Sequence, residues 1–445
     1  MPSAFPWLRG YVRGSFERRY DPRMFRRLAL VSLLLLPTSA WAQGAPAEWI
    51  SWARDHHHPI ASIVTTSNDQ YADLQFLKTV LDGRRIVELG ESGHGVAEFS
   101  QAKVRLIKFL HEQMGFDVMA FESGLFECYM ANQLTGSGPQ MMQSSIFGVW
   151  FTEDVKELFN YIKETQRTDR PLILAGFDTQ TSSSAGTAQR PRFFHSVIDA
   201  VDRDYAVEVF NVDTETIAGL RTGAGYAVAN EARLIEFYEK LLKFLQDRRA
   251  ELAAAFPGDP RPLIAERTAF SVIQFVRQQA VSTDGPRVTQ IRDSGMAENY
   301  TFLARQLYPD RKIISWAHNF HIRHANASAS GSPTMGTFIA ERFRSELYTI
   351  GLYMNRGTAA LNNRAVYAIQ PARADSMEGV LAAVGPANLF VDFLHQTRQA
   401  GTTWFFDRIV TREWGTSDVP MAPRDQYDGV LFIDMVNPPK YVTVF

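Results

Sequence analysis

The chain has 445 residues, of which 45% are hydrophobic, 21% charged and 12% aromatic. This composition is typical of a compact globular protein and argues against a disordered chain. The formal net charge is −2, whereas a nucleic-acid-binding protein would need a basic surface. We therefore expect no nucleic-acid partner.

The N-terminal segment has the features of an export signal. Arg26 and Arg27 precede an apolar run over residues 28–36, and small residues lead up to Ala42. A basic segment, a short apolar run and an Ala-x-Ala pattern are typical of a cleaved signal peptide. We predict that residues 1–42 are removed after Ala42.

Export has consequences for charge and location. Met24 gives a more usual signal length than Met1, so either residue is a candidate start. Removal of the signal, which holds seven Lys+Arg and two Asp+Glu, changes the net charge from −2 to −7. No apolar run reaches the ~20 residues that a spanning helix needs. We expect a periplasmic or secreted protein without stable membrane insertion.

Cys128 is the single cysteine of the chain. One cysteine permits no internal disulfide, no cysteine-rich zinc cluster and no redox pair. Because Phe126, Tyr129 and Met130 surround it in sequence, we expect a small buried residue and not a nucleophile.

Short apolar runs alternate with longer helical patterns along most of the chain. This alternation predicts an α/β fold with a central, mostly parallel sheet flanked by helices. The helical pattern Glu98–Gln113, stopped by Gly115, lies between the first two runs and completes a βαβ unit. The expected strands are Arg85–Leu89, Asp117–Phe121, Leu172–Gly176, Lys312–Ala317, Tyr348–Tyr353, Val366–Ile369 and Val430–Met435.

Strand signals fade between about residues 189 and 292. Long helical patterns replace them, notably Asn230–Phe256 and Pro262–Val281. We interpret this segment as a helical insertion, or a lid over the cleft, within one catalytic domain that spans residues 43–445.

The ends of the predicted strands carry polar side chains. In open parallel sheets, ligands bind beyond the carboxyl ends of the strands, so residues from separate strand ends can meet in one cleft. The residues are Glu91 and His94 after the first strand, Glu122 after the second, Asp178 after the third, and His318 and His321 after the fourth.

Glycines flank the first of these histidines. Gly90, Gly93 and Gly95 permit a tight turn or a close approach of the substrate to the backbone around His94. The Glu-x-x-His spacing alone is common, but the glycines and the other strand ends together favour a catalytic role for His94. Glu122 follows an apolar strand, so we expect it to be paired with a histidine or a cation.

Three kinds of site are compatible with these residues. His94, held by a carboxylate, could activate water without a metal. The same histidines and carboxylates could instead hold zinc or another divalent ion. Aromatic residues such as Phe121 and Trp150 also suit a non-enzymatic binding protein for a hydrophobic ligand. The chain lacks a Gly-x-Ser-x-Gly elbow and a phosphate-binding loop, which argues against a serine hydrolase and a nucleotide site.

The segment Gly90-Glu91-Ser92-Gly93-His94-Gly95, followed by Glu98-Phe99, Lys103 and Arg105, resembles the N-terminal signature of the erythromycin esterase family. Further blocks follow in the family's order, and as an ordered set they are specific. They include Trp150-Phe151-Thr152-Glu153, Gly176-Phe177-Asp178, Arg292-Asp293, Trp316-Ala317-His318-Asn319 and Asp428-Gly429-Val430.

The resemblance implies an enzyme that hydrolyses a carboxylic ester without a covalent intermediate, a reaction best known for the macrolide lactone. We expect no cofactor, with a divalent metal ion kept as the alternative. Macrolide resistance would be one outcome of such chemistry. A small-molecule ester is the implied partner. Lys103 stands where some members carry arginine, and lysine offers a point charge instead of a fork. The implied catalytic residues are His94 as general base, Glu91, Glu122, His318, His321 and Lys103; those expected to bind substrate are Asp178, Trp150, Phe121 and Arg292.

Overall fold

The structure is a computed structural model, which describes residues 44–325 and 332–443. The predicted signal peptide and both candidate start residues lie outside the described residues. From Ala45 onward the chain forms one compact unit. Within the described residues, no helix is both long and apolar enough to cross a membrane.

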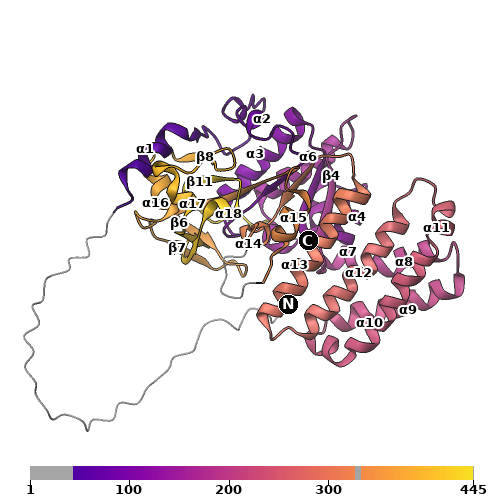
Figure 1. Ribbon diagram of the computed structural model, residues 1–445. Helices are drawn as coiled ribbons and strands as arrows, with labels where there is room; N and C mark the ends of the chain where they lie inside the picture. The colour runs from indigo at the N-terminus through magenta and orange to yellow at the C-terminus, as the bar shows by residue number, and fades with distance from the viewer. Residues whose placement is uncertain (1–43, 326–331, 444–445) are drawn as a thin grey trace, which may run out of the picture. The chain divides into compact units, whose positions relative to one another are not determined.

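A central sheet organises this unit (Figure 1). Within the described residues it has nine strands in the order β1-β8-β11-β6-β2-β5-β3-β4, with β7 paired to β6. The six strands from β11 to β4 are parallel, and β1, β7 and β8 are antiparallel to their neighbours. The strands are β1 His58–Pro59, β2 Ile86–Leu89, β3 Val118–Gly124, β4 Ile173–Asp178, β5 Ile313–Trp316, β6 Leu347–Ala360, β7 Val366–Ile369, β8 Asn388–Asp392 and β11 Gly429–Val436.

The predicted α/β class with a mostly parallel sheet is therefore confirmed. All seven expected strands are present. Their ends differ by three residues or fewer, except that β6 runs seven residues past its expected end at Tyr353. The edge strand β1 and its neighbour β8 were not predicted. Neither was a separate antiparallel hairpin, formed by β9 (Ile409–Glu413) and β10 (Ser417–Met421).

Both faces of the sheet are buried, as expected for parallel strands. Ile86 and Val118 point into one apolar core, and the adjacent Val87 and Met119 point into the other. Helices α3 (Ala97–Met114) and α6 (Glu153–Thr165) cover the second face. Helices α13 (Gly285–Phe302) and α15 (Met335–Phe343) cover the first.

Helix α3 confirms the predicted βαβ unit and places a key lysine. It ends at Gly115, whose φ of 74° is the left-handed conformation that favours glycine at a helix end. The Gly115 N–H donates to the carbonyl oxygen of Leu110. Lys103 lies in the middle of this helix on its buried side.

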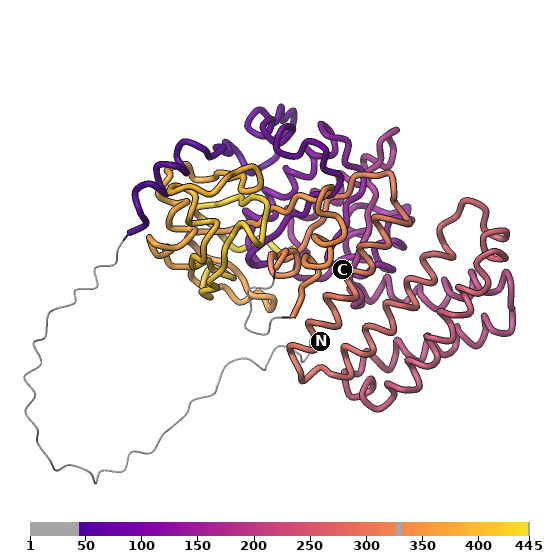
Figure 2. The backbone as a smooth tube through the Cα atoms, viewed as in Figure 1, coloured from indigo at the N-terminus to yellow at the C-terminus, as the bar shows by residue number. Residues whose placement is uncertain are grey.

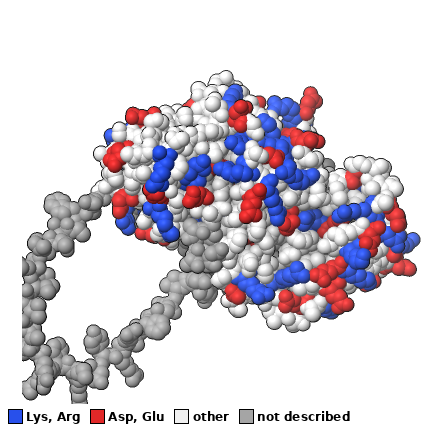
Figure 3. Space-filling model, viewed as in Figure 1, with Lys and Arg blue, Asp and Glu red and all other residues white. Residues whose placement is uncertain are grey.

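The segment expected to be helical contains five helices that pack mainly on one another, as Figures 1 and 2 show. In α10, Leu234, Tyr238, Leu241 and Leu245 recur at helical spacing and are fully buried. Figure 3 shows basic and acidic side chains interleaved over these helices. Their role as a lid stays a prediction. The helices are α8 Arg190–Ile198, α9 Arg203–Leu220, α10 Ala224–Asp247, α11 Arg249–Ala255 and α12 Arg261–Ala280.

Candidate active site

The carboxyl ends of four neighbouring parallel strands, in the order β2-β5-β3-β4, bring the expected polar residues together. Glu122 lies near the end of β3 and Asp178 is the last residue of β4, so both belong to the strands and do not follow them. The β3–β4 register shifts between Phe121 and Gly124, the stretch that contains Glu122. Such a bulge turns a side chain out of the regular alternation of the strand, here toward its partners.

The glycines around His94 allow close contacts that a side chain would block. A Cβ at Gly95 would lie 2.0 Å from the carbonyl oxygen of Ala360, and one at Gly90 would lie 2.0 Å from Asn319 Oδ1. The close contacts found at these glycines are made by Asn319 and Ala360 of the protein itself, and the expected approach of a substrate stays a prediction. These contacts fix the loop that carries Glu91 and His94.

Glu91 holds His94 in one orientation. His94 Nδ1 lies 2.6 Å from Glu91 Oε1, and the indole N–H of Trp150 donates to the same oxygen at 2.8 Å. Since an ionised carboxylate only accepts hydrogen bonds, the neutral His94 ring carries its proton on Nδ1. The Nε2 lone pair is then directed away from Glu91. Nε2 has no hydrogen-bond partner among the described residues.

Lys103 balances the charge of Glu91. Its Nζ lies 2.5 Å from Glu91 Oε2 and 4.2 Å from the centre of the Trp316 ring. Burial lowers the pKa of Lys103 to about 8. Burial also opposes ionisation of Glu91, but Lys103 and His94 together hold the pKa of Glu91 below its usual value. Lys103 is fully enclosed, so it does not face a substrate directly.

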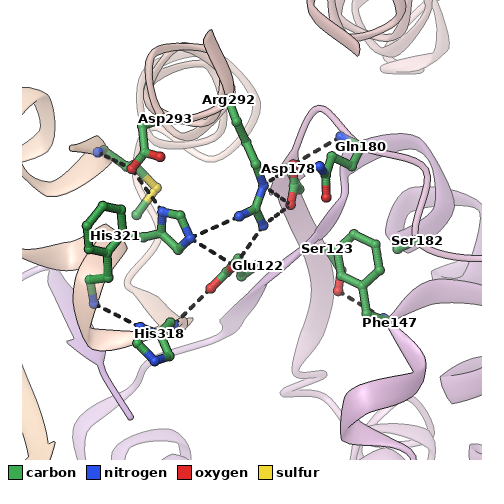
Figure 4. A network of polar contacts seen from close by, with 12 residues as sticks. Glu122, Ser123, Phe147, Asp178, Gln180, Ser182, Arg292, Asp293, His318 and His321 are labelled. Carbon is green, nitrogen blue, oxygen red and sulfur yellow. Dashed lines mark hydrogen bonds and ion pairs between the residues drawn. The ribbon is translucent and has the colours of Figure 1, made fainter. Parts of the chain in front are cut away.

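Arg292 clamps the two acidic strand ends together (Figure 4). One of its terminal nitrogens, Nη2, lies 2.7 Å from Glu122 Oε1 and 2.5 Å from Asp178 Oδ2. Burial acts to raise the pKa of Glu122, but His321 and Arg292 hold it well below its usual value. Both Asp178 and Arg292 were expected to bind substrate. The structure instead shows them bound to each other.

His321 has both ring nitrogens engaged (Figure 4). Its Nδ1 lies 2.9 Å from Asp293 Oδ1, and its Nε2 lies 2.9 Å from Arg292 Nη1. An arginine N–H can only donate, so Nε2 accepts and the ring proton faces Asp293. Glu122 was expected to pair with a histidine or a cation, and its Oε1 lies 3.4 Å from His321 Nε2 and 2.7 Å from Arg292 Nη2.

His318 begins the short helix α14 (Asn319–Ile322). Its backbone N–H donates to Glu122 Oε2 at 2.8 Å, and its Nδ1 accepts from the Phe320 N–H at 3.1 Å. Burial, reinforced by His94, lowers the pKa of His318 well below its usual value. The ring is therefore neutral with its proton on Nε2, which lies 3.7 Å from Glu413 Oε2.

Three residues of the site escaped the sequence analysis. Glu413 pairs with the buried Arg323. Trp414 lies nearly parallel to the ring of His318, with ring centres 5.6 Å apart at 29°. Glu413 ends a strand whose buried charged residues break the apolar pattern, and Trp414 follows it. Their position in the β9–β10 hairpin could have indicated Glu413 and Trp414, whereas Arg323 directly follows α14, two residues after the predicted His321.

Two aromatic residues expected at the substrate lie in the core. Phe121 is fully buried and stacks on Trp316, with ring centres 5.2 Å apart. Trp150 is also buried, and its indole N–H donates a hydrogen bond to Glu91. The structure thus places both behind the site. Cys128 is buried as expected, and burial raises its pKa.

The metal alternative needs free donor atoms. His94 Nδ1 and both nitrogens of His321 are engaged with protein groups. Within residues 44–325 and 332–443, no group of three or more His, Cys, Asp or Glu side chains is arranged to hold a metal ion. The histidine nitrogens of the site that no hydrogen bond engages among the described residues are His94 Nε2 and His318 Nε2.

Comparison with known proteins places this site in a family. A family profile described as erythromycin esterase matches residues 111–436. The chain is 33% identical to YbfO of Bacillus subtilis (strain 168) over 95% of its length and 99% of that protein. The chain belongs to the erythromycin esterase family. The name of YbfO assigns it to the hydrolases without a substrate.

Two further relatives agree with this placement. Erythromycin esterase type I of Escherichia coli is 27% identical over 61% of this chain and 71% of that protein. A mutant of the erythromycin esterase EreC in its open conformation shares the fold, with a TM-score of 0.66 and 19% identity over 87% of this chain and all of that chain. The family and the names of these relatives indicate that this chain is a hydrolase.

Proposed function

We propose that the protein is a carboxylic ester hydrolase in which His94 activates a water molecule. The observation that carries this proposal is the environment of the His94 ring. Its Nδ1 is fixed by Glu91, and its Nε2 is unengaged within the described residues. The His94 side chain is also the most exposed of the three histidines, at 14% against 9% for His318 and 11% for His321.

The proposed reaction needs one proton shuttle. His94 Nε2 takes a proton from water, and the resulting hydroxide attacks the carbonyl carbon of the ester. Collapse of the tetrahedral intermediate breaks the bond to the alcohol oxygen, which receives the proton back from Nε2. The products are a carboxylic acid and an alcohol. Glu91 stabilises the transient imidazolium, and Lys103 keeps Glu91 ionised.

The developing oxyanion needs a donor. Lys103 is enclosed between Glu91 and Trp316, so His318 is the better candidate. Its Nε2–H lies 3.7 Å from Glu413, too far for a strong hydrogen bond, so this N–H can turn to a substrate oxygen. Such contacts often tighten only when substrate is bound.

Macrolide lactones are the first substrate class to test, because relatives carry the erythromycin esterase name. An exported enzyme could cleave such an antibiotic before it enters the cytoplasm, and resistance would follow. We propose this location on the strength of the N-terminal pattern alone.

Mass spectrometry of products tests the proposal. The purified protein is incubated with a panel of macrolides and simple esters, with and without a chelator. With and without the chelator, we expect a macrolide lactone to give one product heavier by one water and a simple ester to give its free acid and alcohol. Loss of the product after chelation, with recovery on adding zinc, would contradict the metal-independent mechanism. No hydrolysis across the panel would contradict the esterase assignment.

A further inference from the structure

Trp414 has an unusual backbone conformation at the corner between β9 and β10. Its φ is 56°, a region that bulky residues rarely adopt and that tends to occur at functional sites. Its N–H donates to the carbonyl oxygen of Ser92 at 2.6 Å, and its own carbonyl accepts from the Tyr367 hydroxyl at 2.8 Å. The first bond ties the hairpin to the His94 loop, and the second ties it to β7.

The indole of Trp414 forms one wall beside the proposed base. It stands perpendicular to the His94 ring, with ring centres 5.5 Å apart at 83°. Gly93 lies against it, since a Cβ there would be 3.1 Å from Trp414 Cε3. The indole also stacks on the His318 ring, with the two ring planes 29° apart. The position of the indole is thus fixed by the same residues that form the site.

Exposure separates Trp414 from the other indole beside His94. Trp150 also contacts the His94 ring, with centres 5.2 Å apart, but it is 1% exposed. Trp414 is only partly buried. A partly exposed indole next to a catalytic base provides apolar surface for a ligand, which is the usual lining of a small-molecule site.

We propose that Trp414 is a specificity-determining residue, against which the apolar acyl or alcohol part of the ester packs while its carbonyl lies at His94. This inference rests on the proposed function. Trp414, and not Trp150 or Phe121, is then the aromatic residue that contacts the substrate, since Trp150 and Phe121 are covered by protein. The preferred substrates would then be esters with an extended apolar group next to the reacting carbonyl.

A chain-length series tests this preference. The activities of wild type, Trp414→Phe and Trp414→Ala are compared on p-nitrophenyl acetate, butyrate and octanoate. We expect Trp414→Ala to lower kcat/KM roughly tenfold or more on octanoate and less than about threefold on acetate, because lost apolar contact matters most for long chains. Trp414→Phe should keep most of the preference. An equal loss on all three esters would contradict the proposal and assign Trp414 a positioning role.

A binding measurement separates this inference from the esterase assignment. N-hexyloctanamide, an amide expected to resist turnover, is titrated while tryptophan fluorescence is followed. We expect a fluorescence change in wild type that is lost in Trp414→Phe and kept in Trp404→Phe, because Trp404 is fully buried in the core. The same change in Trp414→Phe, or none in wild type, would overturn the proposal even if esters are hydrolysed.

Discussion

A buried ion pair sets the charge around His94. Glu91 and Lys103 are both fully buried, 2.5 Å apart. Removing one member of such a pair leaves an uncompensated charge in a medium of low polarity. Glu91 must be ionised to stabilise the His94 imidazolium, so the state of Lys103 should affect both stability and rate.

Replacement of Lys103 by methionine tests the pair. We expect Lys103→Met to lower the free energy of unfolding by about 3–5 kcal/mol, the usual effect of breaking a buried pair, and to lower kcat/KM at least tenfold. Urea unfolding and ester hydrolysis measure the two effects. Lys108→Met, in the same helix with its Nζ over the Tyr161 ring, is the matched control. Similar small losses in both variants would contradict the charge-balancing role.

Lys103 also predicts an alkaline limit of activity. Its pKa is lowered to about 8, so activity should fall as the pH rises through about 8 and Glu91 loses its cationic partner. Lys103→Arg stays charged, and its alkaline limb should lie at higher pH. Between about pH 8 and 10.5, Lys103 binds more protons in the unfolded chain than in the folded one. Its contribution to the free energy of unfolding therefore rises with pH in this range. An unchanged pH–rate profile in Lys103→Arg would refute the assignment.

At the scale of elements, the loop after β2 depends on glycine. Gly95 pairs with Ala360 in an isolated β-bridge, and its missing side chain leaves room for the Ala360 carbonyl. The sequence predicted a tight turn or a close approach of substrate at these glycines, but not the contact with Ala360, because Ala360 is more than 260 positions away. Long-range pairing of this kind has no local pattern.

Gly95→Ala measures how tightly that loop is held. The added Cβ would lie 2.0 Å from a backbone oxygen that cannot rotate away, so we expect a loss of roughly 1–3 kcal/mol in stability and a fall in activity. Gly225→Ala is the control, since it lies in α10 with no atom within 4 Å of the added Cβ. That change should stabilise the protein by roughly 0.5–1 kcal/mol. Destabilisation of equal size in both variants would argue against a special role for Gly95.

Helix α13 connects to the sheet through Arg292. A lysine at this position could not hold Glu122, Asp178 and His321 together, because it lacks the planar fork. We expect Arg292→Lys to lower kcat/KM roughly 10- to 100-fold, whereas Arg287→Lys, an exposed change in the same helix, should leave it within about twofold. Wild-type activity in Arg292→Lys would show that the clamp is dispensable.

Pattern reasoning found the elements that carry long apolar runs. It missed β9, because Arg412 and Glu413 are buried through hydrogen bonds and ion pairs and so interrupt the run. As a result it also missed Trp414. It placed Phe121 at the substrate, since a sequence cannot tell an aromatic residue behind a site from one that faces it.

At the scale of the whole molecule, the sequence indicated the fold class and the meeting of four strand ends. It did not indicate the strand order, which depends on contacts between distant parts of the chain. The signal peptide remains a prediction. Mass analysis of protein exported from a bacterial host should show a mature chain that begins at Gln43. A chain that retains residues 1–42 and stays in the cytoplasm would contradict it.

The central claim is that His94 is the general base, and the rate of His94→Gln tests it most directly. Glutamine keeps a polar side chain beside Glu91 but cannot take up a proton at neutral pH. We predict a kcat/KM for ester hydrolysis at least ~100-fold below wild type, within the usual contribution of general-base catalysis, with an unchanged thermal unfolding curve. A folded variant with kcat/KM within about threefold of wild type would contradict the account.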